Sequence, residues 1–113
     1  MSSLYYIKVK YQNFIIKAMI DCGSQISVIS PNLLKILNLP IIPYNGLVKG
    51  VGKAKLTGLC HNSQLTIGHD IIVHVDLYVM QNEWKQNLVI FGLDFLEKYY
   101  LCFGARIMKK LLI

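Results

Sequence analysis

The stretch "AMIDCGSQISVIS", residues 18–30, places an aspartate between two apolar segments. A carboxylate next to segments that look buried costs free energy unless hydrogen bonds or a function account for it. Gly23 would let the backbone turn sharply just after Asp21. An isolated Asp-x-Gly triplet is a weak signal, because most such triplets are ordinary turns. The apolar flanks on both sides indicate instead a carboxylate presented at a loop tip between two strands.

The length and composition limit the number of domains and the class of protein. A chain of 113 residues has room for one domain, and we predict a single domain over residues 1–113. Its residues are 54% hydrophobic and only 16% charged, an excess that suggests apolar surface covered by a second copy of the chain. No apolar run approaches the roughly 20 residues that span a bilayer, and the start "MSSLYYIKVK" does not resemble a signal peptide. We therefore expect no membrane association.

The formal net charge of +6 has two explanations. It would suit nucleic acid or an acidic partner, or it reflects a solvated basic surface. The lysines are scattered apart from Lys109 and Lys110, and no lysine cluster interleaves with aromatic residues as in a binding platform. The second explanation is favoured, and we do not expect nucleic-acid binding.

The cysteines and histidines indicate neither a disulfide framework nor a metal site. Cys22, Cys60 and Cys102 are an odd number of cysteines at spacings that fit neither. His61, next to Cys60, and the two later histidines do not have the spacing of a tetrahedral site. We predict reduced thiols, a cytoplasmic location (with the nucleus as the alternative), and no metal or cofactor.

Alternating and turn-forming residues predict a mostly β fold of about eight short strands and two short helices. Strands are expected in residues 4–20 (two strands turning at Gln12 and Asn13), 25–30, 46–58 (a hairpin with its tip at 50–52), 59–80 (two strands turning at 68–69), 87–92 and 102–113. One helix should start at Pro31 with Ser30 as its cap and an apolar stripe of Leu33, Leu34, Ile36 and Leu37. A second should cover residues 93–100, with Leu93 and Leu96 inside.

Three motifs in register carry a resemblance to a known family. "AMIDCGSQISVIS" resembles the active-site segment of retropepsin-like aspartic proteases, in which apolar residues precede Asp-Ser/Thr-Gly-Ala/Ser. "VIFGLDFLEKY", residues 89–99, is similar to the family's second element, and "VKGVGKAKLTG", residues 48–58, lies where the family has its flap. "KGVG" and "GLDFL" look most like the DNA-damage-inducible, ubiquitin-linked proteases, whereas "DCGSQ" is also similar to retrotransposon proteases. Both origins remain open.

The resemblance implies a fold, an activity and a partner. The fold would be the closed retropepsin-like β fold, with the active site at a homodimer interface. The family hydrolyses peptide bonds with water activated between two carboxylates that share one proton. A chain with one Asp-x-Gly would obtain the second carboxylate from its partner, so Asp21 of each chain would form the pair. The substrate would be an extended peptide or polyprotein segment.

The resemblance also assigns roles to other residues. Cys22, Gly23 and Ser24 would form the active-site loop, and in some relatives the residue at Ser24 hydrogen-bonds to the catalytic carboxylate. The flap tip would comprise Gly50, Val51 and Gly52, and the support beneath the loop would comprise Ile90, Phe91 and Gly92. The terminal strands, Leu4 to Val9 and Ile107 to Leu112, would form an interface sheet.

Two positions qualify the resemblance. Asp94 is a second candidate carboxylate, but its place at the start of a helix favours a capping or loop-bracing role. Cys22 stands where the family has Ser or Thr, and a thiol is a weaker hydrogen-bond donor than a hydroxyl. The alternative hypothesis is therefore a catalytically inactive dimerisation or binding module that keeps the fold.

Overall fold

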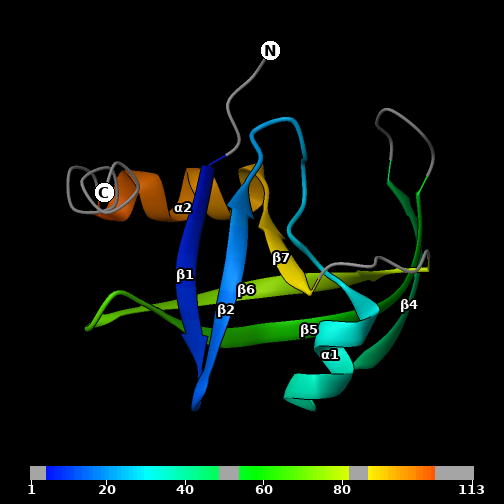
Figure 1. Cartoon of the computed structure of the whole chain (residues 1–113). Helices are drawn as coiled ribbons and strands as arrows, with labels where there is room; N and C mark the ends of the chain where they lie inside the picture. Colours follow the sequence, from blue (N-terminus) through cyan, green and yellow to red (C-terminus); the bar gives the residue numbers. More distant parts are fainter. Residues whose placement is uncertain (1–4, 49–53, 82–86, 104–113) are drawn as a thin grey trace.

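The computed structural model describes residues 5–48, 54–81 and 87–103, which form seven strands and two helices (Figure 1). The strands are β1 (Tyr5–Tyr11), β2 (Phe14–Ile20), β3 (Val28–Ile29), β4 (Ile42–Val48), β5 (Ala54–Ile67), β6 (Ile71–Met80) and β7 (Leu88–Phe91). The helices are α1 (Pro31–Leu37) and α2 (Leu93–Phe103). Neither helix in this part of the chain has the length and apolar character needed to cross a membrane. The expectation of a mostly β fold is confirmed.

The sheet closes into a barrel. The strand order is β1-β2-β7-β3-β6-β5-β4, and β1 pairs again with β5 through Val9 with Ile67 and Lys10 with Thr66. This second pairing joins six strands in a ring and leaves β4 as an outer strand on β5. Closure removes most of the exposed edges that would otherwise pair with other chains.

The β1–β2 hairpin follows the predicted alternation. Ile7 and Val9 point into the barrel, whereas Lys8 and Lys10, which alternate with them, are exposed. The turn lies at the predicted position, and Gln12 adopts a positive φ of 51° there. Strand β2 then runs parallel to β7, with Ile20 beside Phe91. This pairing brings the start of the Asp21 loop next to the end of β7.

Two predicted elements differ from the structure in length. Residues 54–67 form one continuous strand, whereas we predicted a hairpin arm and a separate strand from residue 59. Register shifts at Gly58 and between Cys60 and Ser63 let this strand bend while its pairing with β6 continues. Residues 102 and 103, predicted as the start of a strand, instead end α2, and the rest of that prediction lies outside the described residues.

Helix α1 starts where predicted, with the predicted N-cap residue but without a side-chain cap hydrogen bond. Ser30 is the N-cap residue by position, yet its side chain makes no cap hydrogen bond and accepts one from the Leu88 N–H at 3.3 Å instead. Of the predicted stripe, Leu33 and Leu37 are buried, whereas Ile36 is 50% exposed. Asn38, at a φ of 53°, ends the helix.

Helix α2 buries a different face from the one predicted. Among its residues 93–99, whose side chains the structure describes, Phe95 and Tyr99 are buried, while Leu93 and Leu96 are only partly covered. Phe95 stacks on Phe91 of β7 with ring centroids 3.9 Å apart. The aromatic contact with the barrel, which the helix sequence alone does not reveal, selects this face.

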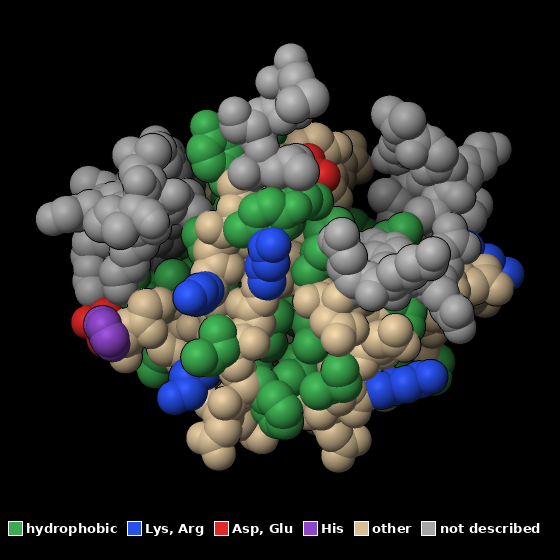
Figure 2. All heavy atoms as spheres, in the orientation of Figure 1, with side chains coloured by type: hydrophobic (Ala, Val, Ile, Leu, Met, Phe, Trp, Pro, Cys, Tyr) green, Lys and Arg blue, Asp and Glu red, His purple; other side chains and the backbone are tan. Residues whose placement is uncertain are grey.

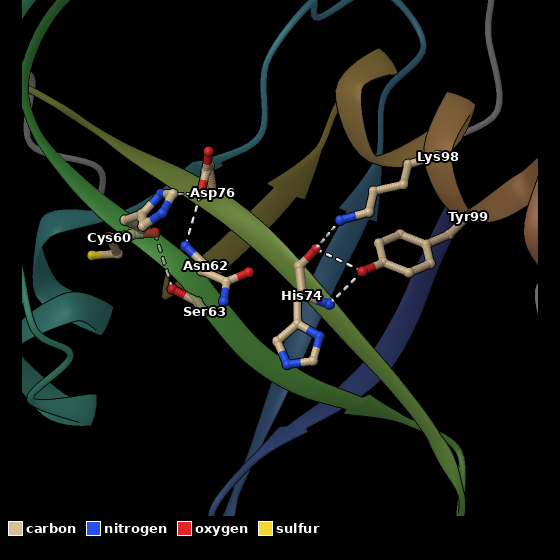
Figure 3. A network of polar contacts seen from close by, with 8 residues as sticks. Cys60, Asn62, Ser63, His74, Asp76, Lys98 and Tyr99 are labelled. Atoms are coloured by element: carbon tan, nitrogen blue, oxygen red, sulfur yellow. Dashed lines mark hydrogen bonds and ion pairs between the residues drawn. The ribbon is translucent and has the colours of Figure 1, made fainter.

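The Tyr99 hydroxyl fastens α2 to β6 (Figure 3). It donates to the His74 carbonyl oxygen at 2.7 Å and accepts from the His74 N–H. Strand β3 pairs with β6 only through Tyr78 and Val79 and does not reach His74. On that side of β6 the Tyr99 hydroxyl therefore bonds to both the N–H and the carbonyl oxygen of His74, in place of a neighbouring strand. This contact fixes the position of the helix that begins directly after the candidate site.

Replacing Tyr99 with Phe should therefore lower the free energy of unfolding. The change removes only the hydroxyl and leaves the two partly buried His74 backbone groups without it, at a cost of about 1–3 kcal/mol. For a domain of this size each kcal/mol lowers Tm by roughly 4–8 °C. Tyr5→Phe is the matched control, because Tyr5 is 53% exposed. Equal melting temperatures for the two variants would contradict the bracing role.

Candidate active site

Asp21 follows directly after β2 and is half-buried. Its backbone N–H donates to the Phe91 carbonyl oxygen at 3.0 Å, which continues the β2–β7 pairing by one residue. Its carboxylate Oδ1 accepts a hydrogen bond from the Gly23 N–H at 2.9 Å. The backbone and the carboxylate are therefore both held, while the side chain keeps access to solvent.

Gly23 and Ser24 contribute in ways that differ from the sequence expectation. The backbone of Gly23 is not in the left-handed region of φ. A side chain is disfavoured there because its Cβ would lie only 3.1 Å from Asp21 Oδ1. The Ser24 hydroxyl donates to the Ile26 carbonyl oxygen at 2.7 Å and not to the Asp21 carboxylate. The Gly23 N–H and the Ser24 hydroxyl therefore shape the loop from within, each through a partner two residues away along the chain.

Gly92 joins β7 to α2 and lies against the Asp21 loop. A Cβ on Gly92 would stand 2.4 Å from the Ile26 carbonyl oxygen and 2.6 Å from the Ser24 carbonyl oxygen, both backbone atoms. The next N–H, that of Leu93, donates to the Ser24 oxygen at 2.8 Å. Only glycine leaves room for this contact, so the loop and the start of α2 are packed backbone to backbone.

Ser27 and Asp94 tie the loop to the helix from the other side. Ser27 is fully buried; its hydroxyl donates to Asp94 Oδ1 at 2.7 Å and accepts from the Gly92 N–H at 3.0 Å. Asp94 Oδ2 also accepts from the Ser27 N–H at 3.1 Å. Asp94 thus has the loop-bracing position expected of it. Ser27 was not singled out in the sequence, because a serine in an alternating segment gives no sign of a partner 67 residues away.

The other predicted support residues lie around the same junction. Phe91 is fully buried and its carbonyl oxygen holds Asp21, while Ile90 is partly buried and stands beside Val28 of β3. The structure thus brings Asp21, Gly23, Ser24 and residues 90–92 together. The flap-tip residues Gly50, Val51 and Gly52 lie outside the described residues, between two strands that pair up to Val48 and Ala54.

The structure describes the side chains of Cys22 and Cys60, and the environments of these two thiols are opposite. Cys22 is exposed beside Asp21, whereas Cys60 is fully buried, and burial raises the pKa of its thiol to about 11. The Cys60 thiol therefore stays protonated at neutral pH. The separate positions also agree with the absence of a metal-binding group among the described residues.

Iodoacetamide at about pH 8 should accordingly label Cys22 and spare Cys60 in the folded protein. With a pKa of about 11, roughly one Cys60 thiol in a thousand is ionised at that pH. Residue-resolved mass spectrometry measures the two rates, and unfolding in urea is the control that should make Cys60 react. Fast labelling of Cys60 without urea would contradict its burial.

The comparisons with known proteins agree with this geometry. A family model described as aspartyl protease matches residues 1–104. The chain belongs to the aspartyl protease family. It is also 32% identical over 102 residues to DNA damage-inducible protein 1 of Neurospora crassa, a match that covers 88% of this chain and 23% of the relative. A second relative, the UBA domain-containing protein Mud1 of Schizosaccharomyces pombe, is 28% identical, with 88% of this chain and 30% of the relative covered.

Solved structures show the same fold. The retroviral protease-like domain of Ddi1 from Leishmania major superposes with a TM-score of 0.70 at 22% identity, covering 87% of this chain and 78% of that one. A retropepsin-like aspartic protease from Rickettsia conorii gives 0.62 at 18% identity, covering 84% and 71%. The chain is thus a retropepsin-like aspartic protease domain related to DNA damage-inducible protein 1. It spans about a quarter of the length of those curated relatives.

Proposed function

We propose that this protease domain is one protomer of a homodimeric aspartic endopeptidase, in which Asp21 of two chains activates a water molecule between them. The placement of Asp21 carries the proposal. Its N–H is fixed to Phe91 and its carboxylate to the Gly23 N–H, so the acid is aligned before substrate binds. Two such carboxylates close together share one proton, and one acts as acid while the other acts as base.

Two other carboxylates of the chain already serve structural contacts, which supports a second chain as the source of the partner acid. Asp94 accepts hydrogen bonds from Ser27, and Asp76 pairs with His61 and with the Asn62 N–H. The chain has one Asp-x-Gly triplet. Exposed apolar side chains such as Tyr5, at 53%, offer surface for self-association.

The proposed substrate is an extended peptide segment, free or within a polyprotein. The β4–β5 hairpin extends beyond the closed ring of strands, where it would cover a bound peptide. We propose a cytoplasmic or nuclear location, which the free thiols of Cys22 and Cys60 support.

Cleavage of a diverse peptide library tests the proposal. The protein should cleave between mildly acidic and neutral pH, where the pair holds one proton, and Asp21→Asn should not. Asp76→Asn is the matched control, because it removes the same charge from β6. Cleavage that survives in Asp21→Asn would refute the assigned residue.

The exposed thiol of Cys22 favours one second candidate, an inactive module with the protease fold. A thiol holds neighbouring loops less firmly than the hydroxyl it replaces. A peptide mimic of the tetrahedral intermediate distinguishes the two, since only a functional pair binds it far more tightly than the matching substrate peptide. Equal affinity for both peptides, together with restored cleavage in Cys22→Ser, would favour the inactive module.

A further inference from the structure

The outer face of the β1–β2 hairpin gathers basic side chains. Lys8 and Lys17 lie directly opposite each other in the strand register, and Lys10 follows two residues along β1. All three are exposed, and residues 5–20 contain no acidic residue. Figure 2 shows lysine side chains among apolar ones in the region where Figure 1 draws these two strands. The sequence shows scattered lysines, but the fold places these three on one face.

This arrangement opposes the stability of the hairpin. Like charges directly opposite each other on a sheet face repel, and no described carboxylate forms an ion pair with these lysines. The Lys17 ammonium lies 4.1 Å from the centroid of the Tyr6 ring, which positions it on the face. Local features that reduce stability often mark functional surfaces, because a binding partner supplies the missing charge.

The basic face continues into a polar depression. An open hollow of about 640 Å³ lies where the β1–β2 and β5–β6 turns meet. Its lining residues carry basic, amide and hydroxyl groups, namely Lys10, Gln12, Gln64, Thr66 and His69, together with Tyr11 and Gly68. The carboxylate nearest to this lining in sequence, Asp70, follows His69 and is already engaged in an interaction. The hollow therefore offers hydrogen-bond donors in line with the lysines.

We propose that this basic face docks an acidic, extended polypeptide segment of a partner or substrate protein. In an extended chain every second side chain points the same way, about 6.6–6.8 Å apart, which is also the spacing from Lys8 to Lys10 along β1. Alternating carboxylates would then meet the lysines in register. Single-stranded nucleic acid fits less well, because it needs free aromatic faces between the lysines, and Lys17 already covers one face of Tyr6, the aromatic residue that alternation places on the face of Lys8 and Lys10. The proposal does not depend on catalysis by Asp21.

Fluorescence anisotropy with a labelled peptide tests the docking. The probe is an alternating Glu-Ser peptide of roughly 12 residues, long enough to span the hairpin. The protein carries Asp21→Asn so that no peptide is cleaved. Changing Lys8, Lys10 and Lys17 together to Gln should weaken binding about tenfold, since each exposed charge pair contributes modestly. Raising the salt from about 50 to 150 mM should weaken binding as well.

A matched variant separates this face from net charge alone. Changing Lys35, Lys85 and Lys98 to Gln removes the same charge from positions outside the β1–β2 and β4–β5 hairpins, and should change the affinity less than about twofold. Equal weakening by both triple variants would overturn the proposal, as would no binding at low salt. Tighter binding of oligothymidine than of the peptide, through the same three lysines, would overturn it in favour of nucleic acid. Melting curves verify that both variants fold.

Discussion

Replacing Asp21 with Asn is expected to abolish peptide cleavage while leaving the fold intact. The asparagine side-chain oxygen can still accept the hydrogen bond that the Gly23 N–H now donates at 2.9 Å. The backbone contact from residue 21 to Phe91 is unaffected. What disappears is the titratable group, and loss of a general acid or base lowers the rate by about 10² to 10⁴-fold.

Measuring both cleavage rate and melting temperature separates an effect of Asp21→Asn on the chemistry from an effect on the fold. Activity should fall by at least about 100-fold with Tm changed by only a few degrees. Asp76→Asn should keep the activity, because that carboxylate serves His61 and the Asn62 N–H at the bend of β5. A large drop in Tm for Asp21→Asn would mean that the carboxylate acts on the fold rather than on the chemistry.

Gly92→Ala is expected to be the most damaging small substitution for the fold. The added Cβ would stand 2.4 Å from the Ile26 carbonyl oxygen and 2.6 Å from that of Ser24. Because both are backbone atoms, the loop or the start of α2 must shift, with a cost of about 3 kcal/mol or more. The shift would also disturb the hydrogen bond from the Gly92 N–H to the buried Ser27 hydroxyl.

Chemical denaturation and cleavage assays measure the two consequences. The midpoint should move to clearly lower denaturant, and any residual activity should be lost because the Asp21 loop packs on this glycine. Gly68→Ala is a useful comparison: Gly68 has a φ of 65° in the exposed β5–β6 turn, so its cost should come from local backbone strain alone, about 1 kcal/mol. Similar effects of the two changes on cleavage would contradict the special role of Gly92.

Much of the fold could be predicted because local patterns dominate it. The β1–β2 hairpin follows from the alternation of buried Ile7 and Val9 with lysines and from a turn-forming Gln12-Asn13. The start of α1 follows from Pro31. Asp21 could be singled out because its flanks are apolar on both sides, which is unusual for a surface turn.

The features that were missed depend on contacts distant in sequence. Helix α2 has apolar residues on several sides, and stacking of Phe95 on Phe91 decides which side is buried. The buried hydroxyl of Ser27 finds Asp94, 67 residues later, only after the barrel has closed. The basic face also depends on register, since Lys8 and Lys17 come together only through strand pairing.

A subunit-mixing experiment measures whether cleavage needs Asp21 from both chains of a dimer. Wild-type protein at constant concentration is mixed with a ninefold excess of Asp21→Asn chains, at a total concentration where all chains are dimeric, and cleavage is measured after exchange. If the site needs Asp21 from both chains, activity per wild-type chain should fall about tenfold, because only pairs of wild-type chains remain active. Unchanged activity would show that each chain cleaves with its own residues, and would contradict the shared site.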